Sequence, residues 1–324
     1  MIIPSLSHTE LQEIKAKIID GLEEVSCNLH PSEHRNHLGI SEIGKPCSRF
    51  IFYKFRWMML EEFDGRMRRL FARGHREEER YVNYLERIGC KVYRFQDPIL
   101  NYHPESGSYF YSAKFEVGDG LIEDVTGHPA HEAEAERLGL KRKQFRVNGV
   151  MGHYGGSCDG VVITPWYPNL PFIGEFKTHN YKSFSYYLEH GLKKGKAQHY
   201  DQMCGYGEKL QIKYGLYFPE NKNDDSIEPE ILELDWQRGK QLELKAQDII
   251  LAKEPPAKIS DNPAFFDCKY CGAKDICHKG AIPLKNCRSC KNSIPTENAT
   301  WTCARFGLIP TDIIPNGCDG WIPI

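Results

Sequence analysis

The stretch CDGVVITPWYPNLPFIGEFKTH, residues 158–179, decides the fold expected for this chain. Strands are expected near residues 158–164 and 171–178, where apolar residues predominate. The intervening PWYPNL holds two prolines and an asparagine and is typical of a turn. The stretch therefore predicts a β-hairpin that carries Asp, Glu and Lys where a core would be expected.

The charged side chains of this hairpin fall into a pattern. Alternate residues of a strand share a face, so Glu175 and Lys177 point the same way, whereas Phe172 and Phe176 take the opposite face. Asp159 opens the neighbouring strand. Across a hairpin, Asp159 and Glu175 come within reach of one metal ion.

Two carboxylates forced together raise each other's pKa, and a divalent cation between them removes that penalty. Hard oxygen ligands favour Mg²⁺ or Mn²⁺, which lowers the pKa of bound water and neutralises charge on a scissile phosphate. Lys177 would orient that water or stabilise the developing oxyanion. The alternative is a half-exposed hairpin with a Glu–Lys pair.

A helix is expected over residues 65–89, and five of its residues recur at spacings of four and three. They are Phe71, His75, Glu78, Val82 and Leu85. This is the pattern of a buried stripe, which His75 and Glu78 interrupt. Polar groups buried there need partners, and a metal is one candidate for the imidazole. The alternative is a structural core histidine.

Another helix is expected near residues 195–211, a range that includes the stretch QHYDQMCGYGEKL. Gln202 and Tyr206 lie four residues apart on one face, and Gln198 extends the same line. Both Gln202 and Tyr206 can hydrogen-bond phosphates or each other.

Eight of the twelve cysteines fall into two spaced sets. The first set, Cys268, Cys271 and Cys277, has the spacing C-x2-C-x5-C and is one ligand short of a tetrahedral site. Cys47 is the best-placed fourth ligand, and His278 is a lower-ranked alternative for a zinc site. A shared metal would tie the start of the chain to residues near 268.

The second set has the spacing C-x2-C-x12-C-x14-C, which fits a four-thiolate zinc site. Its members are Cys287, Cys290, Cys303 and Cys318. Residues 281–324 number only 44, and so short a module usually needs a disulfide or a bound metal to fold stably. The alternative is four unlinked thiols. The remaining cysteines are interpreted as ordinary buried thiols: Cys27, Cys90, Cys158 and Cys204.

The 324 residues, 40% of them hydrophobic, suit one large domain with an appendage or two domains. The order of helices and strands indicates an α/β or α+β fold. No apolar run is long enough for a transmembrane helix, and the N-terminus lacks the pattern of a secretory signal. We therefore expect a cytoplasmic protein without a membrane partner.

The net charge of −2 neither supports nor excludes a nucleic-acid partner. Three local clusters are basic and would contact phosphates or form solvated helix faces. They are Arg66, Arg68, Arg69, Arg73 and Arg76; Lys141, Arg142, Lys143 and Arg146; and Lys193, Lys194 and Lys196.

Taken together, these motifs resemble the PD-(D/E)XK nuclease superfamily, in particular its RecB-like branch with an iron–sulfur cluster. That branch includes CRISPR-adaptation nucleases and the nuclease domains of bacterial recombination complexes. The resemblance covers about residues 39–278. It rests on GISEIGKPC, GHREEE, CDGVV, GEFKT, QMCGY and CKYCGAKDIC, in that order.

The resemblance implies a restriction-endonuclease-like mixed sheet flanked by helices. It implies that His75, Asp159 and Glu175 bind the catalytic metal and that Lys177 is the catalytic lysine. Gln202 and Tyr206 match the branch's Q-x3-Y motif. The four residues that would hold a 4Fe–4S cluster are Cys47, Cys268, Cys271 and Cys277; spacing alone does not distinguish iron–sulfur from zinc.

The chain departs from the family pattern in two places. The segment between His75 and Asp159 is long, and we expect residues 100–157 to be irregular or an insertion around edge strands. The second cysteine set lies outside the shared pattern. No G-x4-G-K-[ST] motif occurs, so the chain resembles a stand-alone nuclease of the kind that phages carry.

We therefore expect a Mg²⁺- or Mn²⁺-dependent DNA nuclease, an exonuclease or end-processing enzyme, formed by residues 1–280 with a zinc-binding module at 281–324. Its partners would be DNA, single-stranded or with free ends, and proteins of recombination or replication. Gln198 and Glu78 would support the site beside Gln202 and Tyr206. The alternatives are a DNA-end-binding or assembly factor with little catalysis and a redox-sensing protein.

Overall fold

The computed structural model describes residues 6–29, 31–96, 99–103, 108–112, 117–118, 121–122, 143–144 and 146–324, and describes side chains in 6–29, 31–94 and 146–324. The expected irregular segment at 100–157 lies mostly outside these residues. So does the basic cluster that begins at Lys141, apart from the side chain of Arg146.

Five strands form the central sheet, in the order β14-β13-β12-β11-β2. Their bounds are Lys91–Tyr93 for β2, Gly160–Thr164 for β11, Tyr167–His179 for β12, Tyr214–Asn221 for β13 and Glu230–Glu233 for β14. β12 and β13 run parallel, and the other neighbours run antiparallel, so the sheet is mixed.

The predicted hairpin is present. β11 pairs antiparallel with β12, with Gly160 opposite Gly174. β12 begins at Tyr167, inside the expected turn, because the register shifts between Ile163 and Thr164 and the pairing then resumes. Only a very short connection therefore joins the two strands, which fixes Asp159 relative to Glu175.

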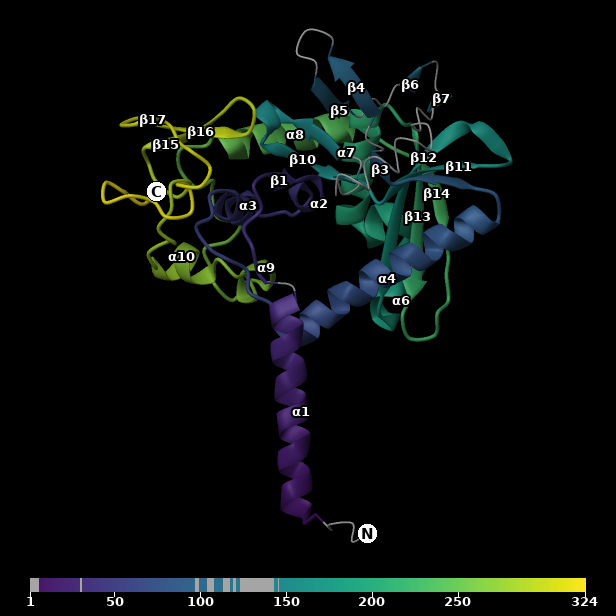
Figure 1. Ribbon diagram of the computed structural model, residues 1–324, viewed down its shortest axis with the longest axis horizontal. Helices are drawn as coiled ribbons and strands as arrows, with labels where there is room; N and C mark the ends of the chain where they lie inside the picture. Colours follow the sequence, from purple (N-terminus) through teal and green to yellow (C-terminus); the bar gives the residue numbers. More distant parts are fainter. Residues whose placement is uncertain are drawn as a thin grey trace.

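Helices cover both faces of this sheet, as expected for the fold class (Figure 1). They are α4 (Gly65–Arg87), α6 (Tyr181–Gly195), α7 (Ala197–Leu210) and α8 (Trp236–Leu251). Tyr81 and Val82 of α4 join Phe172 and Phe176 in one apolar cluster. α7 and α8 share the other cluster with Ile173. The alternation predicted for β12 thus separates two cores.

Helix α6 is absent from the sequence prediction. Its start carries a recognisable signal, because the Asn180 side chain caps it by accepting a hydrogen bond from the Ser183 amide at 2.9 Å. Its buried residues are Phe184, Tyr187 and Leu192. A kink at Gly191, where φ is 67°, interrupts the apolar period, and for this reason the periodicity of the sequence does not reveal the helix.

Short strands and helices complete the body. The three-stranded sheet β1-β10-β9 and three two-stranded pairs accompany the central sheet. The strands are β1 (Leu38–Gly39), β3 (Phe95–Gln96), β4 (Ile99–His103), β5 (Ser108–Ser112), β6 (Val117–Gly118), β7 (Leu121–Ile122), β8 (Lys143–Gln144), β9 (Arg146–Gly149) and β10 (Tyr154–Ser157). The helices are α2 (Ile40–Ile43), α3 (Ser48–Phe55) and the 3₁₀ turn Val150–Gly152.

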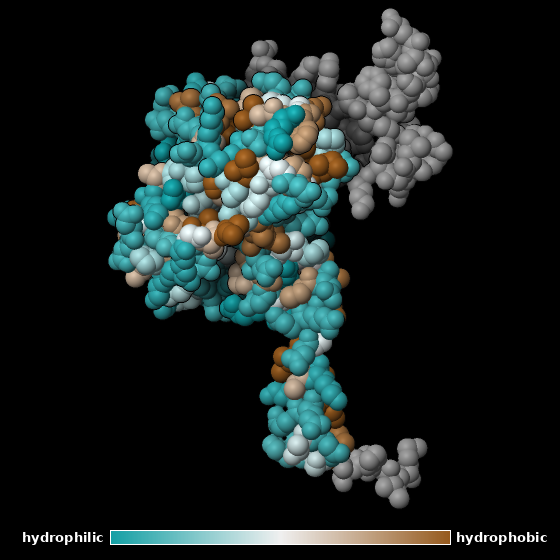
Figure 2. Space-filling view, turned by 90° about the vertical axis from the view of Figure 1, so that its left-hand side faces the viewer, coloured by the Kyte–Doolittle hydropathy of each residue, from teal (hydrophilic) through white to brown (hydrophobic). Residues whose placement is uncertain are grey.

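Helix α1 (His8–Leu29) projects from the body as a rod (Figure 1). Ser7 and Glu10 form a capping box, with the Ser7 amide donating to Glu10 at 2.7 Å and the Glu10 amide to Ser7 at 3.3 Å. Its apolar residues lie along one side of the rod and are exposed (Figure 2). No described helix is apolar enough over a sufficient length to cross a membrane.

The C-terminal segment holds α9 (Phe266–Lys269), α10 (Lys274–Lys279) and the sheet β15 (Ser293–Thr296), β16 (Thr300–Cys303) and β17 (Gly307–Leu308). Arg288 anchors it to the body. Its guanidinium lies 4.5–4.7 Å from the ring centroids of Phe55, Trp57 and Trp301 and is fully buried. Burial among these rings lowers the Arg288 pKa.

Candidate functional site

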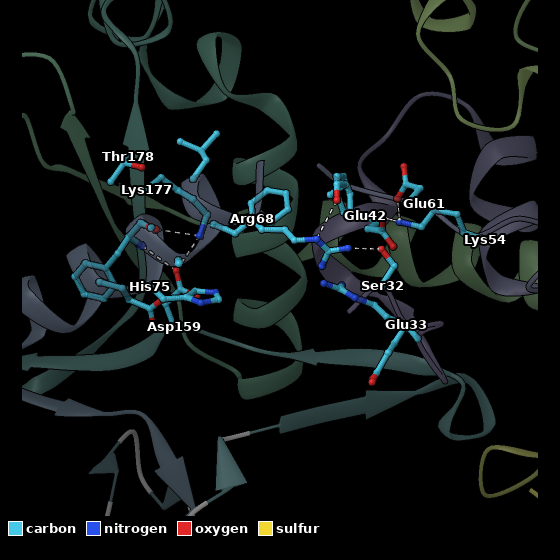
Figure 3. A pocket seen from close by; sticks show the side chains of 18 of the residues that line it. Ser32, Glu33, Glu42, Lys54, Glu61, Arg68, His75, Asp159, Lys177 and Thr178 are labelled. Carbon is cyan, nitrogen blue, oxygen red and sulfur yellow. Dashed lines mark hydrogen bonds and ion pairs between the residues drawn. The ribbon is translucent and has the colours of Figure 1, made fainter. Parts of the chain in front are cut away.

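The structure brings Asp159, Glu175 and Lys177 together where β11 and β12 meet. The Lys177 ammonium lies 2.9 Å from Asp159 Oδ2 and 2.6 Å from Glu175 Oε1. Asp159 directly precedes β11, and the other two residues are alternate residues of β12. The side chains of Lys177 and Asp159 face each other in Figure 3. One cation thus already lies between two carboxylates.

Glu175 is completely buried between the sheet and α7. Burial, and then the charge of Asp159, raise the pKa of Glu175 to about 8, although Lys177 opposes the shift. Gln202 of α7 donates a hydrogen bond to Glu175 Oε2 at 2.9 Å. The carboxylate is therefore fixed in orientation but poorly compensated in charge.

Lys177 is held in its charged form. Burial alone would lower the Lys177 pKa, but Asp159 and Glu175 outweigh that effect and raise it. Asp159 is fixed in turn, because its Oδ2 also accepts the Phe176 amide at 3.0 Å. The cluster is positioned by sheet geometry and not by flexible side chains alone.

Glu78 of α4 extends the acidic region toward Asp159. Burial and the charge of Asp159 raise the Glu78 pKa, and Arg94 opposes them. Arg94 forms a short ion pair with Glu78 and donates to the Asp159 carbonyl at 3.2 Å. The sequence argument missed Arg94, and its position one residue beyond β2 is the signal that would have placed it beside β11.

The buried stripe predicted for α4 is wrong at its N-terminal half. Val82 and Leu85 are buried, but Phe71 and His75 are exposed. The reason is that only the C-terminal half of α4 packs on the sheet, whereas its N-terminal half extends away from the sheet toward α1. His75 lines the pocket beside Asp159 instead (Figure 3). Its role as a metal ligand stays a prediction.

Asp159 and Lys177 open into a pocket of about 1040 Å³. α4 and the strand ends form one wall, and the segment before β1 together with α2 and α3 forms the other. Lys54 bridges Glu42 and Glu61 on that second wall, at 2.5 Å from each (Figure 3). The sequence analysis did not single out these three residues, because they are far apart from the hairpin along the chain.

The Gln202 amide and the Tyr206 phenol of α7 bond other protein atoms and not each other. Gln202 holds Glu175, and Tyr206 donates to the Ser157 carbonyl at 2.7 Å. Gln198 donates to the Ser41 carbonyl at 2.8 Å. Of the three side chains, only Gln202 bonds Glu175, and the other two bond backbone carbonyls.

The arginine cluster on α4 is largely occupied. Arg68 is buried and bonds Ser32, Arg69 pairs with Glu23, and Arg73 donates to the Lys222 carbonyl. These contacts tie α4 to α1 and to the β13–β14 connection. They leave less of this cluster for phosphate contacts than its sequence suggests.

The first cysteine set gathers in space, although 221 residues separate two of its members. One cavity of about 300 Å³ is lined by all four thiols: Cys47, Cys268, Cys271 and Cys277. Burial raises the pKa of Cys271, and the other three thiols add to the effect. The Phe50 amide donates to Cys47 Sγ at 3.4 Å. His278 lines the same cavity, so the alternative fourth ligand is also present.

The second cysteine set also surrounds one cavity, of about 160 Å³. Its lining includes Cys287, Cys290, Cys303 and Cys318. Burial and the three other thiols raise the Cys287 pKa. The Ile322 amide donates to Cys290 Sγ at 3.4 Å. Of the cysteines outside both sets, Cys90, Cys158 and Cys204 are buried as expected, whereas Cys27 is half-buried on α1.

Among the described side chains, no group of three or more His, Cys, Asp or Glu residues is arranged to hold a metal ion. For the acidic cluster the reason is visible, because Lys177 lies between the carboxylates and His75 comes from the helix on the other face of the sheet. The cysteines of each set share a cavity without converging on one point.

No protein-family model and no curated protein matches the chain. Similar solved structures include SSO0001, at 12% identity and a TM-score of 0.39, over 80% of this chain and 96% of that one. LHK-Exo in complex with dAMP has 12% identity and a TM-score of 0.36, over 66% and 86%.

The alkaline exonuclease LHK-Exo from Laribacter hongkongensis, in a further structure, has 11% identity and a TM-score of 0.33, over 67% and 87%. At such values the likeness concerns the chain path alone. The functional conclusions below therefore rest on the site.

Proposed function

We propose that this chain is a metal-dependent DNA nuclease of the PD-(D/E)XK type that hydrolyses phosphodiester bonds at DNA ends. The convergence of Asp159, Glu175 and Lys177 carries the proposal, because Asp159 and Lys177 line the large pocket and Glu175 lies buried directly behind Lys177. A fully buried carboxylate beside a second one is costly for folding alone, and such arrangements are typical of sites that act on a ligand.

The donor set fits a hard divalent cation. Asp159 and Glu175 offer carboxylate oxygens, the ligands that Mg²⁺ and Mn²⁺ prefer, and His75 lies at the rim of the same pocket. Burial and the charge of Asp159 raise the pKa of Glu175, and a divalent ion bound there would favour its charged form. Such an ion would supply an activated water and charge neutralisation at the phosphate.

The chain's own residues would then have separate roles. Asp159 and Glu175 hold the ion, and Gln202 keeps the Glu175 carboxylate in one orientation. Lys177, charged and fixed at the pocket floor, stabilises negative charge that develops on the phosphate. The pocket volume of about 1040 Å³ leaves room for a nucleotide strand end.

The two cysteine sets would hold structural cofactors. We assign a 4Fe–4S cluster to Cys47, Cys268, Cys271 and Cys277, since four thiols and backbone amide donors to sulfur suit such clusters. We assign zinc to the smaller cavity of the second set. An iron and zinc count of the purified protein tests both, with about four irons and one zinc per chain expected.

The activity is tested by incubating the purified chain with end-labelled single- and double-stranded DNA, with and without Mn²⁺. We expect cleavage only with the metal, and a loss of about 10²–10³-fold or more in Lys177→Ala and Glu175→Ala. Lys213→Ala is the matched control, because Lys213 also pairs with a strand glutamate, Glu233, but on the exposed sheet edge.

Cleavage that survives both Lys177→Ala and Glu175→Ala would remove the assignment. DNA-end binding by the wild-type chain without any metal-dependent cleavage would favour the alternative of a binding or assembly factor.

A further inference from the structure

Two aromatic rings beside the first cysteine set face solvent. Phe266 is 79% exposed and Tyr270 is 78% exposed, the highest values among the described aromatic residues. They lie on either side of Cys268, which is 6% exposed. Neither ring stacks on another ring of the described chain, and only the Lys269 ammonium lies over one face of Tyr270.

The rings stand on a fixed turn. The amides of Cys268 and Lys269 both donate to the Phe265 carbonyl, at 2.9 and 2.8 Å. Cys268 anchors this turn in the cavity of the first cysteine set. A rigid support reduces the entropy lost when a ligand orders the side chains, which favours binding at this place.

Unpaired cations accompany the rings. The Lys269 ammonium lies 5.1 Å from the Tyr270 ring centroid. No described carboxylate lies within ion-pair distance of Lys269 or Lys274. Asp261 and Asp275 are engaged with Lys258 and Lys279, which leaves Asp267 as the acidic neighbour on this turn. Rings next to free ammonium groups suit a ligand that alternates flat bases with phosphates.

The turn borders the large pocket. The cavity that holds Tyr270 and the first cysteine set shares Lys45 and Glu61 with the pocket of Asp159 and Lys177. In Figure 1, α9 lies near α3, and residues of both helices line the same cavity. A strand whose end reaches Lys177 can therefore leave the pocket over this turn.

We propose that Phe266 and Tyr270 form a stacking platform for unpaired bases of the DNA strand whose end occupies the pocket. This proposal rests on the nuclease function above and assigns it a substrate, a single-stranded end. Bases in a duplex are stacked on their neighbours and cannot offer both faces to a protein ring. The platform thus selects single strands or frayed ends over closed duplex.

The test measures binding of fluorescein-labelled dT20 by anisotropy, in the Lys177→Ala background and without divalent metal. Phe266→Ala and Tyr270→Ala should each weaken binding about tenfold, and the double variant about a hundredfold. Phe266→Tyr and Tyr270→Phe should bind as before, because a ring is kept. A 20-base-pair blunt duplex should bind weakly and should not respond to these changes.

Trp166→Ala and Tyr181→Ala are the matched controls, since these side chains are 66% and 62% exposed and lie away from the turn. They should leave dT20 binding unchanged. An abasic strand of the same length should bind the parent chain more weakly and show no further loss in Phe266→Ala. Equal iron content in all variants excludes indirect damage to the cysteine site.

The platform is overturned if Phe266→Ala and Tyr270→Ala bind dT20 like the two controls. It is also overturned if the rings prove to hold a protein, shown by unchanged DNA binding and altered self-association in sedimentation. Lys177-dependent cleavage, together with unchanged dT20 binding in Phe266→Ala and Tyr270→Ala, would contradict the platform but not the nuclease function. Binding of dT20 that requires Phe266 and Tyr270, without any cleavage that requires Lys177, would contradict the nuclease function but not the platform.

Discussion

The acidic cluster on the central sheet and the two cysteine cavities are built in opposite ways. Asp159, Glu175 and Lys177 stand on paired strands, and their charged atoms already touch at 2.6–2.9 Å. The thiols come from loops, from short helices and from the end of β16, and those of each set only share a cavity; Cys47 precedes α3 and Cys268 lies in α9.

The difference shows what each kind of framework can fix. Strand pairing sets the positions of alternate side chains closely, and Lys177 forms ion pairs with both carboxylates of the cluster. The cysteine sites lack any internal group that could hold four thiols together. We therefore expect metal loss to leave the acidic cluster folded but to loosen the cysteine regions.

The sharpest contrast is expected at the zinc set. Cys303→Ser should release the segment 281–324, with a local loss of up to about 10 kcal/mol, because zinc binding supplies much of the folding free energy of such modules. Trp301, which is 1% exposed, would then reach solvent. A red shift of tryptophan emission and faster proteolysis after residue 280 would report it. Cys27→Ser, on α1, should change neither.

Loss of a cysteine from the proposed iron–sulfur set should also loosen the structure, and the effect should extend to residues that are distant in sequence. Cys268→Ser should abolish the visible absorption of the cluster and detach α9 from α3, while the central sheet keeps its circular dichroism. Hydrogen exchange should rise around Cys47, which is distant in sequence. Retained absorption and iron in Cys268→Ser would exclude this cysteine as a ligand.

A smaller effect is expected from the residue that orients Glu175. Gln202→Leu leaves Glu175 Oε2 without its donor, which costs about 1–3 kcal/mol in transition-state stabilisation, or roughly 5–150-fold in kcat. Gln198→Leu is the control, since Gln198 bonds only the distant Ser41 carbonyl. Equal kcat values for the two variants would contradict the positioning role of Gln202.

A further effect concerns the stability of the fold and its dependence on pH. The pKa of Glu175 is raised to about 8 in the folded chain, so the folded state binds the extra proton between pH 4.5 and 8. The resulting stabilisation is present at low pH and is lost as the pH rises toward 8, by at most about 1.4 kcal/mol per pH unit.

Urea unfolding without added Mg²⁺ or Mn²⁺, from pH 5 to 8, measures this dependence. The wild-type curve should fall more steeply than that of Glu175→Gln. Parallel curves would show that Glu175 does not titrate in this window.

Apolar periods and turn residues act locally, and they predicted the hairpin and the helix from residue 65 onward, whereas the mixed sheet was implied by the family resemblance. The sequence did not predict α6, where Gly191 interrupts the apolar period, and its prediction that Phe71 and His75 are buried was wrong. The latter error arose because a helix period reveals a face but not where the helix leaves the sheet.

The site was predictable to the extent that it follows strand alternation. Glu175, Lys177 and Asp159 are together as expected, since one register determines all three. The hydrogen bond from Gln202 and the ion pair from Arg94 depend on how α7 and β2 pack against the hairpin. Such long-range contacts leave no periodic signal in a single sequence.

The central claim, that the sheet cluster holds a divalent cation, is tested most directly by counting Mn²⁺ bound per chain with electron paramagnetic resonance. The count should be made at pH 8, in the wild type, Asp159→Asn and Glu175→Gln. We predict that the wild type binds Mn²⁺ in a tight class of sites and that both variants lose this class. Unchanged Mn²⁺ binding in both variants would contradict the account.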